Sequence, residues 1–463
     1  MLTYELDRRG DLPLYEYLYR CIRKDILDGT LEPDARLPSK RALAEHLQVS
    51  VITVETAYQQ LEAEGYVLSA PRRGFFVAKV EQAPKAETVP AAAPETRSAR
   101  KWRLDLKQNL VDVSRFPVSA WVRLTRQVLS EGGSALLSPV PHQGLLALRQ
   151  AIAHDLWERK GMAVSPEQIV VGAGAEYLYL LLAQLLGRES ILAVEDPGYP
   201  KIRQVYEKWG LPCCPVTLDH QGVSPQALVK AGAAAVHLSP SHHYPTGLVT
   251  PIGRRQALLR WAETHDGIII EDDYDSEFRF AGRPLPTLQS IDRSGRVIYM
   301  NTFSQTISPS MRMGFMVLPL PLLGRYQQEL NFYSCTVPAL DQHVLARFLD
   351  RGYYDQHISR MRKEYRLRRA RVLEAFRTSP FADRVEIAEE GAGLHFLLHL
   401  HTERSDEEIR QRAEVLGVRL AFLSEYAAQN REAYAHTLIV NYAGLTREQL
   451  PETVALLADV FAE

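Results

Sequence analysis

The sequence predicts a multi-domain protein in which a small helical unit with a β-hairpin precedes a larger α/β domain. The chain has 463 residues, which is more than one hydrophobic core usually serves. Residues 80–103 are rich in Ala, Pro, Glu and Thr without an apolar period, as is typical of a linker. After them, helical patterns alternate with short apolar runs, which indicates a mostly parallel sheet buried on both faces.

The composition is that of a globular protein without a dominant charge. Hydrophobic residues make up 46% and charged residues 24% of the chain, and the net charge is −2, so no global basic field favours nucleic acid or membranes. The opening "MLTYELDRRG" has no apolar signal core, and the apolar run 177–186 is too short to cross a bilayer. The four cysteines form neither a disulfide framework nor a zinc spacing. We therefore expect reduced thiols, no metal site and a cytoplasmic protein.

Residues 1–79 show the pattern of a DNA-binding unit. Apolar residues recur at helical spacing over 14–26, and "LPSKRALAEHL" predicts a second helix. After the break "QVS", a third helix begins with Ser50 as its cap. The alternating segment that follows turns at "APRRG", which predicts a two-stranded ribbon with a basic tip. This order is that of a winged helix-turn-helix, whose helix after the turn can enter a major groove.

The candidate DNA contacts lie at two helix starts and at the tip of the hairpin. They are Ser39, Lys40, Arg41, Ser50, Thr53, Arg72 and Arg73. Over residues 1–80 the chain has 11 Lys and Arg against 12 Asp and Glu, so the unit is not basic overall. The positive charge is instead clustered at 40–41 and 72–73, and a dimer would double each cluster.

This unit closely resembles the GntR-type winged-helix domain. The resemblance rests on a Pro-Leu-Tyr opening, "ILDGTL", "LPSKRALAEHLQVS", "TVETAYQQLEAEGY" and the wing. It implies a DNA operator as partner and a role in transcription regulation. One departure is Val51, where the family commonly has an arginine that approaches DNA. Valine cannot contact a phosphate, although it can pack on a thymine methyl group.

In the larger domain, polar and small residues follow the predicted strands. "GAGAEY" (172–177) precedes a helix, and amides at a helix start can hold a phosphate. Tyr199 in "EDPGY" can stack on a flat ligand or simply cover the core. "EDDYD" (271–275) follows the apolar run "GIII", so a carboxylate there can keep a ring nitrogen protonated. "TFSQTISPSMR" (302–312) contains a hydroxyl and a guanidinium that suit a phosphate.

Taken together, these motifs resemble the fold-type-I aminotransferases over roughly residues 105–463. With the N-terminal unit, the chain resembles the MocR-type subfamily of the GntR regulators, in which this domain binds pyridoxal 5′-phosphate (PLP), senses an effector and forms the dimer. The resemblance implies that Tyr199 stacks on the ring, that Asp272 pairs with the pyridine nitrogen and that Tyr274 pairs with the 3′ oxygen. It implies a phosphate cup made of Gly174, Ala175, Thr302 and Arg312.

The main departure from that subfamily is Gln305, which occupies the position of the lysine that bonds the cofactor. An amide is not a nucleophilic amine, so Gln305 cannot form the Schiff base, and we expect no catalytic residue and no enzyme. We expect PLP or a PLP–amine adduct to bind non-covalently. One alternative is a regulator whose degenerate site binds a different effector or none. Another is a PLP-dependent aminotransferase.

The resemblance also implies a division of the chain into four segments. We expect the DNA-binding domain at 1–79, the linker at 80–103, the aminotransferase-like large domain at 104–324 and a small α+β C-terminal domain at 325–463. We expect two chains to form a homodimer through the large domains, so that each linker positions one winged helix over one half of an operator. The expected partners are therefore double-stranded DNA, a small-molecule effector and a second copy of the chain.

Overall fold

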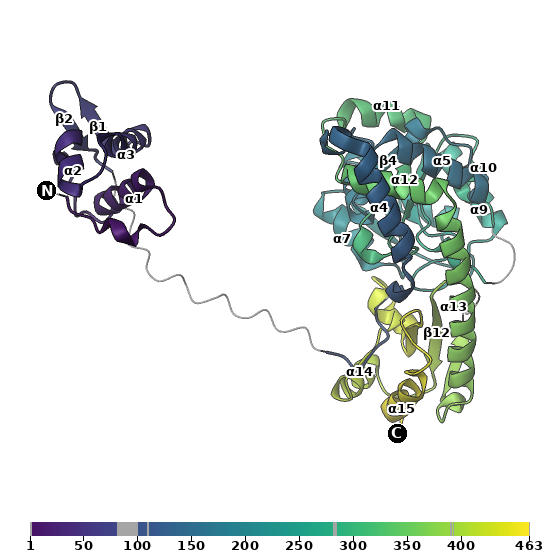
Figure 1. Ribbon diagram of the computed structural model, residues 1–463. Helices are drawn as coiled ribbons and strands as arrows, with labels where there is room; N and C mark the ends of the chain where they lie inside the picture. Colours follow the sequence, from purple (N-terminus) through teal and green to yellow (C-terminus); the bar gives the residue numbers. More distant parts are fainter. Residues whose placement is uncertain are drawn as a thin grey trace. The chain divides into compact units, whose positions relative to one another are not determined.

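The computed structural model describes residues 2–80, 101–108, 111–280, 285–388, 391 and 393–462. The chain divides into two compact units, Met1–Arg100 and Lys101–Glu463 (Figure 1). Most of the expected linker at 80–103 lies outside the described residues. Among the described residues, no helix is both long enough and apolar enough to cross a membrane.

The N-terminal unit contains three helices and a hairpin, as the sequence predicts. Its elements are α1 (Leu14–Leu27), α2 (Lys40–Leu47), α3 (Val51–Ala63), β1 (Val67–Ala70) and β2 (Gly74–Val77). Ser39 and Ser50 cap α2 and α3, because their side chains accept hydrogen bonds from Ala42 N and Thr53 N. The strands β1 and β2 pair antiparallel, and the Tyr58 ring packs edge-on against the Phe75 ring at 5.0 Å. The hairpin is thereby fixed to the buried side of α3.

A seven-stranded sheet in the order β4–β10–β9–β8–β7–β5–β6 forms the centre of the second unit. Its strands are β4 (Ile169–Gly172), β5 (Leu192–Asp196), β6 (Cys213–Thr217), β7 (Ala235–Leu238), β8 (Ile268–Asp272), β9 (Val297–Thr302) and β10 (Gly314–Val317). The strand β10 is antiparallel to β4 and β9, and the other neighbouring strands are parallel. The expected mostly parallel sheet is confirmed. Because parallel strands end at the same edge, the residues after β5, β7, β8 and β9 meet there.

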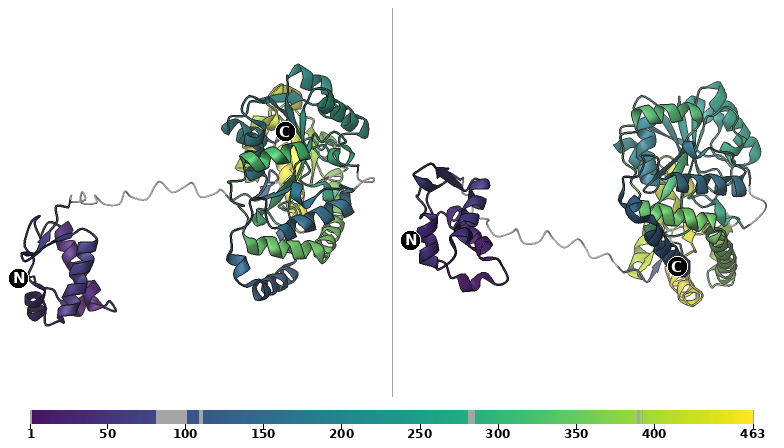
Figure 2. Two further views of the ribbon diagram at one scale, coloured as in Figure 1. Left: turned by 90° about the horizontal axis from the view of Figure 1, so that it is seen from above. Right: turned by 45° about the horizontal axis from the view of Figure 1, so that its top comes forward.

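Helices cover both faces of this sheet (Figure 2). They are α4 (Val118–Gly132), α5 (Leu146–Lys160), α6 (Ala175–Leu186), α7 (Pro200–Lys208), α8 (Pro225–Lys230), α9 (Ile252–Thr264), α10 (Leu288–Ile291), α11 (Leu320–Glu329) and α12 (Ala339–Asp350). In β4, Ile169 and Val171 join a core with α4, α5 and α12, whereas Val170 joins a core with α6 and α11. Successive strand residues therefore face opposite helical layers, and both faces are dry.

The C-terminal domain has a three-stranded antiparallel sheet of its own. It contains β11 (Val385–Ala388), β12 (His395–Leu400), β14 (Thr437–Asn441), α14 (Asp406–Val415) and α15 (Leu450–Phe461), and β13 (Val418–Arg419) pairs with β3 (Leu104–Asp105). The long helix α13 (Tyr353–Arg377) joins the two cores, because Ile358 and Met361 pack in the large domain while Val372 and Phe376 pack in the small one.

Packing contacts cross both of the domain limits expected from the sequence. The C-terminal domain expected at 325–463 would include α12, but α12 packs on α4 and α5 and shares the core of the large sheet. At the other limit, Leu104 and Leu106 pack in the C-terminal core. The sequence pattern could not show either point, because apolar periodicity marks a buried face without naming the element that covers it.

Candidate functional site

Asp272, the last residue of β8, lies at the centre of a buried polar network. Its Oδ2 accepts a hydrogen bond of 2.7 Å from the Tyr179 hydroxyl of α6 and lies 3.3 Å from His237 Nε2 of β7. The other ring nitrogen of His237 lies 3.1 Å from the Tyr206 hydroxyl. Burial raises the pKa of Tyr179 well above its ordinary value, so its hydroxyl remains a donor.

The second oxygen of Asp272 has no such partner. Oδ1 is buried and has no hydrogen-bond partner among the described residues. A buried carboxylate oxygen without a donor is costly, and a ligand that brings a cationic N–H group would remove that cost. A protonated pyridine ring has this chemistry.

A cavity of about 220 Å³ lies at the edge of the sheet where β5 and β7 end. His237 lines it, together with three tyrosines, Tyr199, Tyr244 and Tyr426. The Tyr199 ring lies edge-on to the Tyr244 ring at 6.0 Å, and the Tyr244 and Tyr426 hydroxyls are 3.2 Å apart. Tyr199 is 41% exposed, so its ring is available to cover a flat ligand.

Two titratable groups of this cavity are held in their neutral forms. Burial raises the pKa of Glu195 to about 8 and lowers the pKa of His243 to about 3. Their side chains are 3.4 Å apart, and Glu195 Oε2 also accepts a hydrogen bond from Ser239 N. At neutral pH the pair therefore consists of a protonated carboxyl and a neutral imidazole.

Gly174 and Arg312, two residues of the expected phosphate cup, lie next to each other. Gly174 has φ +87° just before α6, and a Cβ atom placed there would lie 3.0 Å from Arg312 Nη2, so this position requires glycine and brings the Arg312 side chain to the helix start. Glu176, in the first turn of α6, forms ion pairs with Lys201 (2.7 Å) and with Arg312 (3.6 Å). An acidic side chain thus lies where a phosphate was expected.

Three other predicted cofactor residues, Thr302, Gln305 and Tyr274, lie at the end of β9 and in the loops that follow β9 and β8. Thr302 is buried at the end of β9, and Gln305 is partly buried, with no partner for its Oε1 among the described residues. The Tyr274 hydroxyl lies 3.1 Å from His242 Nδ1, and the same nitrogen lies 2.9 Å from Asp275 Oδ2. Tyr274 therefore already has a protein partner at the oxygen that was expected to meet the ligand.

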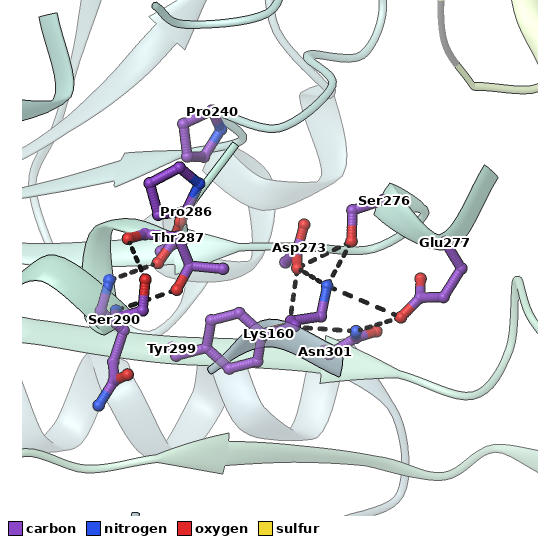
Figure 3. Close-up of polar contacts among 12 residues, drawn as sticks. Lys160, Pro240, Asp273, Ser276, Glu277, Pro286, Thr287, Ser290, Tyr299 and Asn301 are labelled. Atoms are coloured by element: carbon purple, nitrogen blue, oxygen red, sulfur yellow. Dashed lines mark hydrogen bonds and ion pairs between the residues drawn. The ribbon is translucent and has the colours of Figure 1, made fainter. Parts of the chain in front are cut away.

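Asp273, next to Asp272, faces the opposite layer of the domain. Figure 3 shows Lys160, at the end of α5, between Asp273, Ser276 and Glu277. The Asp273 Oδ2 atom lies 2.5 Å from Lys160 Nζ and also accepts a hydrogen bond of 2.8 Å from the Tyr299 hydroxyl. Burial alone would raise the pKa of Asp273, but Lys160 and its hydrogen bond hold that pKa below its usual value.

The candidate DNA contacts of the N-terminal unit differ in exposure and in the partners that their side chains have within the unit. Arg41, Arg72 and Arg73 are exposed. Lys40 instead forms an ion pair of 2.6 Å with Glu55 and lies over the Phe75 ring. The hydroxyls of Ser39, Ser50 and Thr53 take part in the helix caps.

Sequence reasoning did not single out several residues of these sites. They are Lys160, Glu176, Tyr179, His237, Tyr244 and Tyr426. Glu176 stands within the quoted "GAGAEY", and a charged residue in the first turn of a helix is a usable signal. Tyr179 and His237 gave no such signal, because a tyrosine in an apolar helix and a histidine in an apolar strand are usually core residues.

Comparisons with known proteins agree with this two-part architecture. Residues 14–77 match the family described as bacterial regulatory proteins, gntR family. The HTH-type transcriptional regulator YdeL of Bacillus subtilis is 36% identical over 98% of both chains. The probable rhizopine catabolism regulatory protein MocR of Rhizobium meliloti is 32% identical over 98% of this chain and 95% of its own.

The chain is a MocR-type member of the GntR family of transcriptional regulators. The pyridoxine biosynthesis transcriptional regulator PdxR of Corynebacterium glutamicum is 34% identical to this MocR-type chain over 81% of each. Among solved structures, the Pyrococcus horikoshii kynurenine aminotransferase has a TM-score of 0.68 at 24% identity, covering 79% of this chain and 91% of its own. The second unit of this MocR-type regulator therefore has the fold-type-I aminotransferase fold.

The residues of this MocR-type regulator fit a PLP ring better than they fit a PLP phosphate. The unpartnered Asp272 Oδ1 suits a protonated ring nitrogen, and Tyr199 is free to lie against the ring. Backbone N–H groups at the start of α6 and the Arg312 guanidinium suit a phosphate, but Glu176 already binds Arg312. Gln305 provides no amine. Because its side chain is an amide, residue 305 cannot itself form a Schiff base.

Proposed function

We propose that this regulator binds PLP, or an adduct of PLP with an amine, without a covalent bond, and that the ligand alters how a dimer engages its operator. The observation that supports it most is the buried Asp272 Oδ1 atom, which has no partner among the described residues. Bound PLP would supply the cation that this oxygen lacks. Asp272 would hold the ring nitrogen, Tyr199 would cover the ring and Arg312 would contact the phosphate.

The binding mode is tested by the absorption spectrum of the purified protein with added PLP. Gel filtration, with and without prior borohydride reduction, separates bound from free chromophore. We expect a perturbed chromophore that survives gel filtration and that borohydride does not fix to the protein. A chromophore fixed by borohydride would mean that another lysine bonds PLP, and no retained chromophore would remove PLP from the proposal.

A specific observation supports one alternative, in which the site has a different effector or none. Glu176 places a negative charge beside Arg312, where PLP would place its phosphate. In that case the domain would mainly form the dimer. A thermal-shift screen with amines and amino acids, run with and without PLP, separates the two proposals. Under the first proposal, these compounds raise the melting temperature only when PLP is present. Under the alternative, any stabilisation by them does not depend on PLP.

An enzymatic role is the weaker proposal, because transamination needs an amine at position 305 to transfer protons. The half-reaction with each of the standard amino acids, followed by the loss of PLP absorbance, decides the point. We expect no conversion above that of free PLP. Conversion that depends on the protein would reinstate the aminotransferase alternative.

The proposed dimer is supported by apolar side chains exposed on one element of the large domain. Val118, Val122 and Leu129 of α4 are 41–59% exposed, and Leu137 just beyond it is 90% exposed. Such a cluster is typical of an interface. Sedimentation equilibrium should give a dimer for the wild type and a monomer for a Val122→Asp/Leu129→Asp variant. A monomeric wild type at micromolar concentration would contradict the paired model.

The proposed DNA contacts are tested by the salt dependence of operator binding. A site selected from a random duplex library provides the probe. Arg72→Ala/Arg73→Ala should weaken binding to all sequences about equally and reduce the slope of affinity against salt by about 1 for each phosphate contact that is lost. Lys40→Ala should have a smaller effect on the slope, because Lys40 is paired with Glu55. Equal salt slopes for the wild type and both variants would mean that other residues contact the phosphates.

A further inference from the structure

The start of α6 contains an acidic side chain held between two basic ones. Glu176 Oε1 lies 2.7 Å from Lys201 Nζ, and Glu176 Oε2 lies 3.6 Å from Arg312 Nη2. The three side chains are each about half exposed. They come from three different segments of the chain: the first turn of α6, the first turn of α7 and the loop before β10.

This arrangement occupies the cations that a phosphate at the helix start would use. The backbone N–H groups in the first turn of a helix have no partner within the helix and favour an anion. Glu176 places a carboxylate in this first turn. The hydrogen bond with Lys201 is the main cause that lowers its pKa; burial opposes it, and the charges of Lys201 and Arg312 lower the pKa further. The carboxylate is therefore negative throughout the neutral range.

The Arg312 side chain lies close to the start of α6. Its backbone has φ +46°, and its guanidinium lies against Gly174, where even a methyl group would come within 3.0 Å of Nη2. A ligand phosphate that approaches Arg312 must therefore come close to Glu176. Two negative groups would then compete for one guanidinium, in a place where solvent weakens the repulsion without removing it.

We propose that Glu176 determines the specificity of the site by weakening the binding of ligands that carry a phosphate. The preference of this site for PLP over the unphosphorylated form would then be much smaller than that of a phosphate cup without an acidic side chain. This inference rests on the proposed function, in which a pyridoxal-type ring binds beside Asp272. Glu176 is a specificity residue here because it lies at the atoms that would contact the phosphate.

The experiment compares pyridoxine 5′-phosphate with pyridoxine, which share the ring and lack the aldehyde that reacts with lysines. Glu176→Gln keeps the size of the side chain and removes its charge. We expect this variant to bind pyridoxine 5′-phosphate about tenfold more tightly than the wild type does, with the affinity for pyridoxine little changed. Isothermal titration calorimetry with the full-length chain in phosphate-free buffer gives both dissociation constants.

Two further variants make the comparison specific. Glu329→Gln removes a similarly exposed carboxylate that is paired with Arg325 at 2.9 Å on α11, and it should change neither affinity. Glu176→Gln/Arg312→Gln should lose the tenfold gain, because the gain depends on a freed Arg312. An affinity for pyridoxine 5′-phosphate that is equal or lower in Glu176→Gln would overturn the inference.

Inorganic phosphate separates this inference from the proposed function. If neither pyridoxine compound binds any variant, the proposed ring site fails. Glu176 is then judged by phosphate alone, titrated against the wild type and Glu176→Gln. Tighter phosphate binding in the variant would still support competition at Arg312, and unchanged phosphate binding would overturn it.

Discussion

The neighbouring carboxylates Asp272 and Asp273 face opposite layers of the large domain and have different partners. Asp272 receives a hydrogen bond from the neutral Tyr179 hydroxyl and lies beside His237. Asp273 lies 2.5 Å from the Lys160 ammonium group. Both keep an Oδ1 atom without a partner among the described residues, so the presence of the lysine is the main difference.

This difference distinguishes a structural ion pair from the ligand site proposed above. A buried carboxylate next to a lysine already has its compensating charge within the fold. A buried carboxylate that contacts hydroxyl and imidazole groups is well oriented by them. Neither group carries a permanent positive charge that would compensate the charge of the carboxylate. Asp272 is therefore suited to a cationic ligand atom, and Asp273 is suited to fixing α5 against the loop that contains Ser276 and Glu277.

The largest expected effect is on stability, when Lys160 is replaced by methionine. Lys160→Met leaves Asp273 buried without its cation, and it should lower the free energy of unfolding of the second unit by about 3–5 kcal/mol. Urea unfolding followed by tryptophan fluorescence measures this change. Lys208→Met, at an exposed position on α7, is the control and should stay within about 0.5 kcal/mol of the wild type. A loss below about 1 kcal/mol for Lys160→Met would contradict a structural role for the pair.

The second effect should be on binding rather than on stability. Asp272→Asn keeps an acceptor for Tyr179 but removes the negative charge, and the free energy of PLP binding should weaken by about 1.5–3 kcal/mol. Titration of the PLP absorbance measures it. Asp266→Asn, at an exposed carboxylate paired with Arg296, should bind PLP as the wild type does. If Asp272→Asn were as unstable as Lys160→Met and bound PLP normally, the two roles would be reversed.

The third effect concerns how stability depends on pH. It arises at Glu195, a buried carboxyl that lines the cavity and has no charge at neutral pH. Its pKa, raised by burial from 4.5 to about 8, means that its favourable contribution to stability is complete below about pH 4.5 and is lost as the pH rises through about 8. Glu195→Gln stays neutral, so its advantage over the wild type should grow between these pH values and then level off. Thermal melting at several pH values tests this, and parallel curves for the two proteins would contradict it.

The sequence predicts where the two carboxylates lie, but it does not predict which of them pairs with a lysine. The run "EDDYD" after a buried strand predicts carboxylates at the edge of a parallel sheet, and the period of two predicts that neighbours face opposite ways. The sequence cannot say which layer contains the ligand. Lys160 lies 113 residues before Asp273, and no local pattern connects them.

The proposed phosphate subsite shows the same limit. Gly174, Ala175 and Arg312 could be placed there because Gly-rich helix starts and arginine-containing loops have a known chemistry with anions. The ion pairs of Glu176 with Lys201 and Arg312 depend on where α6, α7 and the loop before β10 meet. That meeting point is set by packing in the core under α6 and is invisible to a local pattern.

The sequence by itself determined the two-part organisation, the winged helix, the alternating α/β pattern and the absence of an amine at residue 305, because local spacing and residue chemistry are enough for each of them. Only the tertiary structure decided that α12 belongs to the large core and that Leu104 and Leu106 belong to the C-terminal one. It also decided that Asp273 pairs with a lysine whereas Asp272 contacts a hydroxyl and an imidazole, and that Arg312 contacts Glu176. These outcomes depend on contacts between distant segments, and such contacts are chosen by the burial and charge of the whole fold.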